Sequence, residues 1–319
     1  MKNKNSINKS MYININGSKQ WINIYGNSLE NPVLLYLHGG PGASSSHFDH
    51  VITRKWADVY TVVSWDQRNC GKSYSKKQSN IKLTKDLFIS DGIELVKFLL
   101  DYLSKEKITL LGHSWGTIYG ANLVLEYPEY FDCFIGAGQV VDIIDNEIEF
   151  KKEALKWAKD DQKGLELVNK LTPNDFTLEH FAIRNQIMEK YGYDIFACGR
   201  DYSLFKAIVF NPNYSLKDWL KYFRRNNSAY LDFLLSCEFR SFSIKNKTTY
   251  KIPFYNINGD KDYQTNYKIA QGYFDRINAP FKKMYIMKDM THGLLESKSK
   301  DFSKIVHEIK LIQDNIKNN

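Results

Sequence analysis

The sequence of 319 residues lacks the patterns that mark several large classes of protein. It has no run of about 18 apolar residues, the length that a membrane-spanning helix needs, and segment 1–10 is polar, without the apolar centre of a signal peptide. Its four cysteines lie far apart, with no CxxC pair and no metal-ligand spacing: Cys70, Cys133, Cys198 and Cys237. We therefore expect a cytoplasmic protein with reduced thiols and no metal site.

The formal net charge of +8 is not gathered into a basic run. Lysines are scattered among acidic residues, and the pairs at 76–77 and 282–283 are shorter than the runs that bind nucleic acid or anionic membranes. Neither a P-loop nor a dinucleotide-binding fingerprint occurs. With 43% hydrophobic and 25% charged residues, the composition is that of an ordinary globular protein. The sequence predicts a folded protein that needs no cofactor and has no nucleic-acid or membrane partner.

Strand and helix patterns alternate over the first part of the chain. Two short alternating segments around the Asn16-Gly17 pair predict an opening hairpin, and the continuous apolar run 33–37 predicts a strand buried on both faces. Further strands are predicted at 60–65, 108–111 and 133–137, and helices at 84–103 and 115–126. This alternation is typical of parallel βαβ units in a doubly wound sheet.

The rhythm changes between residues 140 and 249, where charged, helix-like stretches such as 147–160 and 216–239 replace the strand signals. Alternation resumes with strands at 252–258 and 282–287 and helices at 266–277 and 300–316. We therefore predict an α/β core made of residues 1–139 and 250–319, interrupted by a mostly helical cap at 140–249.

Residues 112–116, Gly-His-Ser-Trp-Gly, fit the G-x-S-x-G pattern and lie directly between a predicted strand and a predicted helix. In that context the pattern is typical of the nucleophile turn of the α/β-hydrolase fold. The flanking glycines are needed because the turn is too tight for side chains, and its strain exposes the serine hydroxyl. We expect Ser114 to be the nucleophile.

A serine hydroxyl needs a base, which is oriented by an acid, and in this fold they follow in the order Ser, acid, His. His292 is the histidine in a loop just after the last predicted strand, and we expect it to be the base. Asp260 and Asp262 both follow the strand at 252–258, and alternation points them in similar directions. We favour Asp262, which reaches further past the strand end, and interpret Asp260 as a turn residue.

Acyl transfer also needs donors for the oxyanion. One should be the backbone N–H of Trp115, and the second should come from the glycine-rich loop at 38–42. Pro41 has no N–H, so we favour Gly40, with Gly39 as the alternative. For the charged segment 66–68, Asp-Gln-Arg, we favour a structural salt bridge over substrate binding.

These residues resemble the proline iminopeptidase family of α/β-hydrolase serine peptidases. The resemblance rests on His-Gly-Gly-Pro-Gly at 38–42, Asp-Gln-Arg at 66–68 and Gly-His-Ser-Trp-Gly at 112–116, and it covers roughly 12–139 and 251 to the end. The family's Gly-x-x-Asp matches 259–262 and independently implies Asp262 as the acid. The chain departs from the family pattern at Asn69 and Cys70.

The resemblance implies an aminopeptidase that cleaves N-terminal proline or another small residue from short peptides. Such enzymes use cap glutamates to hold the substrate's α-amino group, and Glu238 is our first candidate. A serine esterase or lactonase acting on small acyl substrates is the alternative, because the same catalytic core serves both. A non-catalytic receptor that uses the hydrolase pocket is the third interpretation.

Overall fold

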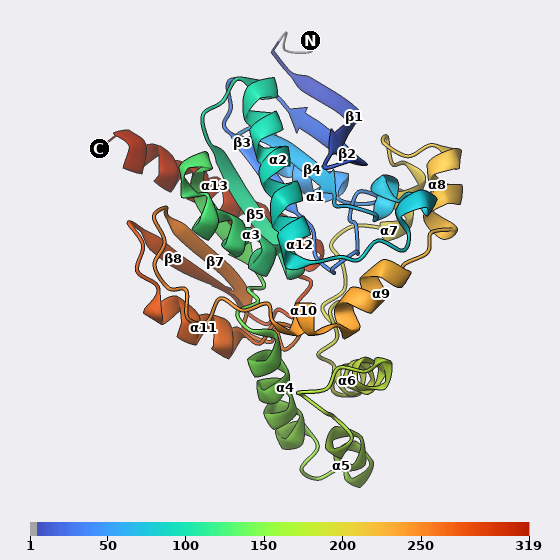
Figure 1. Cartoon of the computed structure of the whole chain (residues 1–319). Helices are drawn as coiled ribbons and strands as arrows, with labels where there is room; N and C mark the ends of the chain where they lie inside the picture. Colours follow the sequence, from blue (N-terminus) through green and yellow to red (C-terminus); the bar gives the residue numbers. More distant parts are fainter. Residues whose placement is uncertain (1–4, 319) are drawn as a thin grey trace.

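The computed structural model describes residues 5–318. At its centre is an eight-stranded sheet in the order β1-β2-β4-β3-β5-β6-β7-β8 (Figure 1). The strands are β1 (Ile7–Ile15), β2 (Ser18–Gly26), β3 (Val33–Leu37), β4 (Thr61–Asp66), β5 (Ile108–His113), β6 (Phe131–Ala137), β7 (Phe254–Gly259) and β8 (Lys282–Met287). Strands β3 to β8 pair in parallel, whereas β2 pairs antiparallel with both β1 and β4. The predicted mostly parallel α/β sheet is confirmed.

The opening hairpin turns at the predicted Asn-Gly pair. Asn16 and Gly17 have φ values of 46° and 72°, the left-handed region that a two-residue type I′ turn requires at both positions. Asparagine and glycine are the residues that enter this region at least cost. This turn sets the register of β1 on β2, in which Ile15 pairs with Ser18 and Ile7 pairs with Gly26.

Helices cover both faces of the sheet, and each face has its own core (Figure 1). Successive residues of β3 alternate between them: Leu35 belongs to one core, and Leu34 and Tyr36 belong to the other. The first core includes residues of α2 (Lys85–Leu103), α3 (Trp115–Glu126) and α11 (Tyr267–Arg276), and the second includes residues of α1 (His50–Thr53), α12 (Leu294–Ser297) and α13 (Ser299–Asn318). Short 3-10 turns lie at Arg54–Trp56, Gly71–Ser73, Lys76–Gln78 and Pro128–Tyr130. The continuous apolar run of β3 thus reflects burial on both faces, as predicted.

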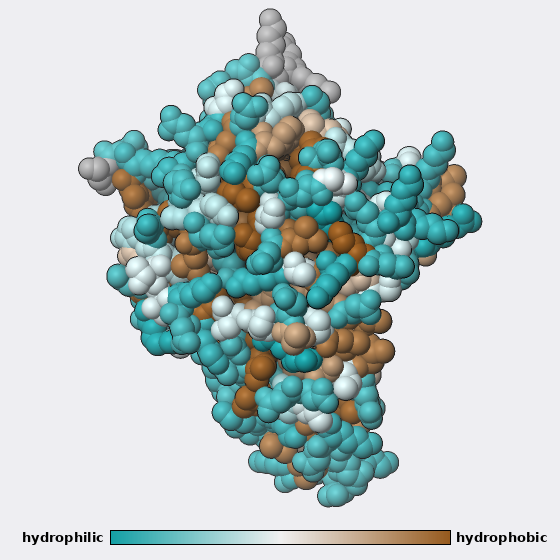
Figure 2. All heavy atoms as spheres, viewed as in Figure 1, coloured by the Kyte–Doolittle hydropathy of each residue, from teal (hydrophilic) through white to brown (hydrophobic). Residues whose placement is uncertain are grey.

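Between β6 and β7 the chain forms seven helices among the described residues: α4 (Ile143–Trp157), α5 (Gln162–Asn169), α6 (Leu178–Tyr191), α7 (Leu204–Val209), α8 (Leu216–Phe223), α9 (Ser228–Leu235) and α10 (Cys237–Arg240). We keep the name cap for the predicted insertion, residues 140–249, which contains these helices. Helices α4 to α6 project away from the sheet (Figure 1), share a small core that includes Phe150 and Ile187, and end in a largely hydrophilic surface around α5 (Figure 2).

Two cap helices differ from the sequence expectation. Helix α4 begins at Ile143, four residues earlier than predicted, because the Asp142 side chain accepts the Asp145 backbone N–H at 2.8 Å and caps the helix there. The helix-like stretch 216–239 is divided into α8, α9 and α10. Across residues 5–318, the structure contains no helix whose length and hydropathy would let it span a bilayer.

Candidate active site

Ser114 lies in the tight turn between β5 and α3, with φ of 55° and ψ of −121°. A positive φ is costly for a residue with a side chain, so the surrounding structure must hold it. The flanking glycines let the chain pack this tightly around the turn. A Cβ at Gly112 would lie 2.3 Å from the carbonyl oxygen of Gly116, and a Cβ at Gly116 would lie 2.3 Å from the carbonyl oxygen of Leu37. The strand, turn and helix predicted around Ser114 are all present.

His292 and Asp262 contact each other in a buried pair. Nδ1 of His292 donates to Oδ2 of Asp262 at 2.8 Å, and the Asp262 side chain is fully buried. Thr265 also contacts the pair: its backbone N–H donates to Oδ1 of Asp262 at 3.0 Å and its hydroxyl donates to Oδ2 at 3.1 Å. Because the carboxylate accepts the Nδ1 proton, the neutral ring has its lone pair on Nε2.

The end of β6 connects this pair with Ser114. The backbone N–H of Ser114 donates to the carbonyl of Ala137 at 2.9 Å, and a Cβ on Gly138 would lie 2.9 Å from Cε1 of His292. Nε2 of His292 is buried and has no hydrogen-bond partner among residues 5–318. The fold therefore brings all three predicted residues to one edge of the sheet, without a hydrogen bond between Ser114 and His292. Such catalytic bonds are often long in unliganded enzymes.

Asp260 has a different set of contacts. Its Oδ1 accepts the backbone N–H of Met290 at 3.3 Å, which ties the turn after β7 to the loop that carries His292. The contact joins two loops and does not close the turn of Asp260 itself, so the interpretation of Asp260 as a turn residue stays a prediction.

The glycine-rich loop after β3 lies directly against Ser114. A Cβ on Gly39 would be 3.2 Å from Cβ of Ser114, and Gly40 has φ of 121°, which only glycine adopts readily. Gly40 lines the same cavity as Ser114 and Trp115. Trp115 is the first residue of α3, so its N–H has no carbonyl partner within the helix.

Gln67 joins these two elements, and sequence analysis did not assign it a role. Its Oε1 accepts the indole N–H of Trp115 at 3.2 Å, and its Nε2 donates to the carbonyl of His38 at 3.3 Å. Its position between Asp66 and Arg68 in a motif shared with the family was the available signal. Gln67 therefore connects the glycine-rich loop with the start of α3.

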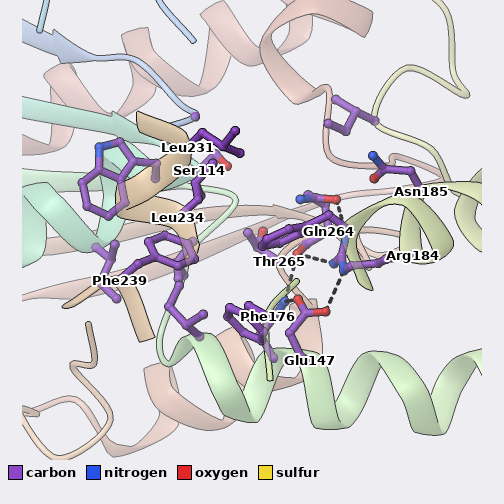
Figure 3. Close-up of a pocket in the computed structure, with 18 of the residues that line it drawn as sticks. Ser114, Glu147, Phe176, Arg184, Asn185, Leu231, Leu234, Phe239, Gln264 and Thr265 are labelled. Atoms are coloured by element: carbon purple, nitrogen blue, oxygen red, sulfur yellow. Dashed lines mark hydrogen bonds and ion pairs between the residues drawn. The ribbon is translucent and has the colours of Figure 1, made fainter. Parts of the chain in front are cut away.

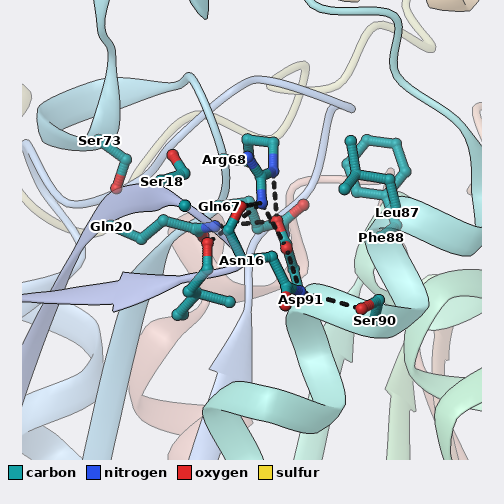
Figure 4. Close-up of polar contacts among 12 residues, drawn as sticks. Asn16, Ser18, Gln20, Gln67, Arg68, Ser73, Leu87, Phe88, Ser90 and Asp91 are labelled. Atoms are coloured by element: carbon teal, nitrogen blue, oxygen red, sulfur yellow. Dashed lines mark hydrogen bonds and ion pairs between the residues drawn. The ribbon is translucent and has the colours of Figure 1, made fainter.

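The neighbouring Arg68 forms the predicted structural salt bridge (Figure 4). Its Nε and Nη2 each donate to the Asp91 carboxylate at 2.6 Å, and both side chains are buried. Asp91 also accepts from Asn16 and Gln20, so the pair braces the hairpin, the loop after β4 and α2. Asn69, where the family has glycine, has φ of 56°; asparagine is among the residues that tolerate this region, so the backbone path is kept.

A cavity of about 410 Å³ opens between Ser114 and the cap (Figure 3). Most of its wall is apolar and includes Trp115, Ile118, Phe176, Phe181, Leu234 and Phe239. Its polar side is formed by Glu147, Arg184, Asn185 and Gln264 (Figure 3). Within residues 5–318, no cluster of three or more His, Cys, Asp or Glu side chains is arranged to hold a metal ion.

Glu147 is an acidic residue in this wall, and it is paired. Its Oε2 accepts from Nε of Arg184 at 2.9 Å and lies 3.1 Å from Nε2 of His180, and its Oε1 accepts from Asn146 at 3.2 Å. Burial alone would raise the pKa of Glu147, but the Arg184 charge and the His180 hydrogen bond lower it overall. The carboxylate therefore stays ionised.

Glu238 lies elsewhere. Its carboxylate accepts the backbone N–H of Lys85 at 3.2 Å, in the first turn of α2, and it is not among the residues lining the cavity with Ser114. Sequence analysis did not single out Glu147, and the signal that could have found it was its spacing. It shares one helical face with Ile143, Phe150 and Ala154, so it is an acid on an apolar stripe.

Residues 32–194, about half of the chain, match the family described as alpha/beta hydrolase fold, and the chain belongs to that family. Among curated proteins it is 28% identical over 314 residues to the probable aminopeptidase YbaC of Bacillus subtilis (strain 168), covering 91% of this chain and 92% of that protein. It is 27% identical over 182 residues to the proline iminopeptidase of Clostridioides difficile (strain 630), covering 56% and 58%.

Solved structures agree on the fold. The chain matches a proline iminopeptidase-related protein from Thermus thermophilus with a TM-score of 0.65 at 18% identity, over 96% of this chain and 98% of that one. At this identity the likeness concerns the fold alone. The curated relatives named above confirm the resemblance to proline iminopeptidases that the motifs indicated.

Proposed function

We propose that this protein is a serine hydrolase with Ser114 as nucleophile, His292 as general base and Asp262 as the acid that orients the base. The observation that carries this proposal is the 2.8 Å contact between Asp262 and Nδ1 of His292. It supports the proposal because a ring that donates from Nδ1 has its acceptor lone pair on Nε2, and the strained Ser114 turn lies at the same edge of the sheet.

In the proposed reaction, Nε2 of His292 takes the Ser114 hydroxyl proton as Oγ attacks the substrate carbonyl. The oxygen becomes negatively charged and accepts hydrogen bonds from the backbone N–H groups of Trp115 and Gly40. His292 then gives its proton to the leaving amine or alcohol, and water attacks the acyl-enzyme by the reverse proton route. The Asp262 carboxylate stabilises the imidazolium in both halves.

For the substrate, we propose a short peptide with a free N-terminal residue that is proline or another small apolar residue. The likeness to a protein named probable aminopeptidase, which extends over nearly all of both chains, supports this class. An exopeptidase must pair the substrate's ammonium group, because a buried cation without a partner is costly. We assign that role to Glu147 in place of Glu238, because Glu147 lines the cavity and its Oε1 accepts from Asn146 alone among residues 5–318.

The pairing of Glu147 with Arg184 favours a second candidate. The two charges offset each other, so this part of an otherwise apolar wall carries no net charge. An uncharged acyl group fits such a wall without an unpaired charge, which is the requirement of an esterase acting on small acyl substrates.

A substrate panel on the purified protein tests the proposal. We expect hydrolysis of prolyl or alanyl arylamides with a free amino group, loss of turnover when that amine is acylated, and fluorophosphonate labelling at Ser114. Ser114→Ala should remain folded, escape labelling and lower activity at least about a thousandfold. Labelling at another serine would refute the nucleophile. Cleavage of N-blocked compounds and p-nitrophenyl esters, without action on free-amine arylamides, would establish the esterase instead.

A further inference from the structure

The segment 262–266 carries the proposed acid and belongs to the core, yet the cap holds its backbone. Nδ2 of Asn146, on α4, donates to the carbonyl of Gln264 at 3.0 Å, and its Oδ1 accepts the N–H of Asn266 at 2.7 Å. At the start of the same segment, Asp262 and Thr265 bond to each other and contact His292. Two cap-to-core bonds thus lie within two residues of the groups that orient the base.

Arg184, on α6, adds the largest set of such bonds (Figure 3). Its Nη2 donates to the carbonyls of Tyr263 and Gln264 at 3.1 and 3.0 Å, and its Nη1 donates to Oε1 of Gln264 at 2.5 Å. The two carbonyls lie between Asp262 and Thr265 in the chain. Nε donates to Glu147, so one guanidinium group bridges the acid in the cavity wall and the backbone of the acid-bearing segment.

The chemistry of these bonds requires an arginine. Arg184 is 2% exposed, and its planar group presents donors in several fixed directions at once. A lysine at this position would place one compact charge and would not reach all of these acceptors together. Without the guanidinium group, the part-buried carbonyl of Tyr263 and the Gln264 side chain would lose these donors, and the Gln264 carbonyl would keep only the bond from Asn146.

We propose that Arg184 is a positioning residue of the active site. From the cap, it holds residues 262–265 in the conformation that keeps Asp262 and Thr265 against Nδ1 of His292. This inference rests on the proposed serine hydrolase function and deepens it: a displacement of the cap would loosen the orientation of the base, so cap position and catalytic competence are coupled.

The test measures the rate of fluorophosphonate labelling of Ser114, because the small probe reports the nucleophile and base rather than peptide binding. The variants are Arg184→Lys and the double variant Arg184→Met/Glu147→Gln, which avoids an unpaired buried carboxylate. The control is Arg240→Met, a cap arginine whose Nη1 donates to the carbonyl of Leu235 within the cap. Circular dichroism and thermal unfolding establish which variants are folded.

We expect labelling to slow about 10- to 100-fold in the double variant, less in Arg184→Lys, and less than about twofold in the control. With p-nitrophenyl acetate, kcat should fall while KM stays within about twofold.

Unchanged labelling rates in folded Arg184 variants would overturn the inference, and so would a change confined to KM, which would make Arg184 a substrate-binding residue. If the double variant does not fold, Arg184→Lys decides by the same criteria. If the parent is not labelled at Ser114, the proposed function fails, and this inference fails with it. A labelled parent with unaffected Arg184 variants refutes the positioning role alone.

Discussion

Gly138→Ala is the substitution for which the structure gives the sharpest expectation. Gly138 follows β6 with φ of 62°, and a Cβ there would lie 2.9 Å from Cε1 and 3.1 Å from Nδ1 of His292, and 3.3 Å from Oδ2 of Asp262. Ordinary contacts begin at 3.4 Å, so the imidazole ring must move by about 0.5 Å. Both atoms of the 2.8 Å bond between Asp262 and His292 are affected.

Two effects of different size follow. Placing alanine at a left-handed φ costs about 1–2 kcal/mol in the free energy of unfolding, whatever surrounds it. Displacing the ring costs activity, because a misplacement of about 1 Å in a catalytic group lowers rates about a hundredfold. For the smaller shift here we expect kcat/KM to fall about 10- to 100-fold in a protein that remains folded.

Gly17→Ala separates the two effects. Gly17 has a similar φ of 72°, and a Cβ there would meet nothing within 4 Å. Urea unfolding should show a comparable loss of stability for both variants, whereas initial rates and fluorophosphonate labelling should fall in Gly138→Ala alone. Equal activity of the two variants would refute the placement of His292 against β6, and with it the proposed role of this histidine.

Three further outcomes are expected. Asp262→Asn should lower kcat/KM about 10⁴-fold through the wrong imidazole tautomer, while Asp260→Asn should change it only several-fold; the reverse order would show that the other carboxylate is the acid. On free-amine arylamides, Glu147→Gln should lower kcat/KM at least about tenfold. Glu238→Gln should leave turnover unchanged and cost about 1 kcal/mol of stability, because it weakens a contact at the start of α2. Steady-state kinetics and urea unfolding of both variants will decide. Burial raises the pKa of Asp66 from 3.8 to about 7, so the folded state binds the extra proton between these values. The contribution of this proton to stability is present below about pH 4 and is lost as the pH rises through about 7. The unfolding free energy of the parent should therefore fall relative to that of Asp66→Asn over that range. A constant difference between the two proteins would contradict this expectation.

Much of the core and the identity of the proposed catalytic residues were predictable from the sequence, because each depends on a short stretch of chain. The apolar run of β3 and the boundaries of α3 follow from local composition and from the Gly-His-Ser-Trp-Gly turn. The turn at Gly17 depends on one backbone conformation that few residues adopt. In the same way, the chain order Ser114, acid, His292 follows from the Gly-His-Ser-Trp-Gly motif and from the order of the predicted strands.

Only the tertiary structure decided which cap acid faces the cavity and what holds the acid-bearing segment. Glu238 lies on α10 and contacts the start of α2, whereas Glu147 lies in the cavity wall. The bonds from Arg184 to Gln264 join residues 80 positions apart, and no local pattern encodes them. The physical reason is that strands and tight turns are stabilised by neighbours in the chain and by burial. The direction of a charged cap side chain depends instead on which partners the packing of several helices brings within hydrogen-bonding distance.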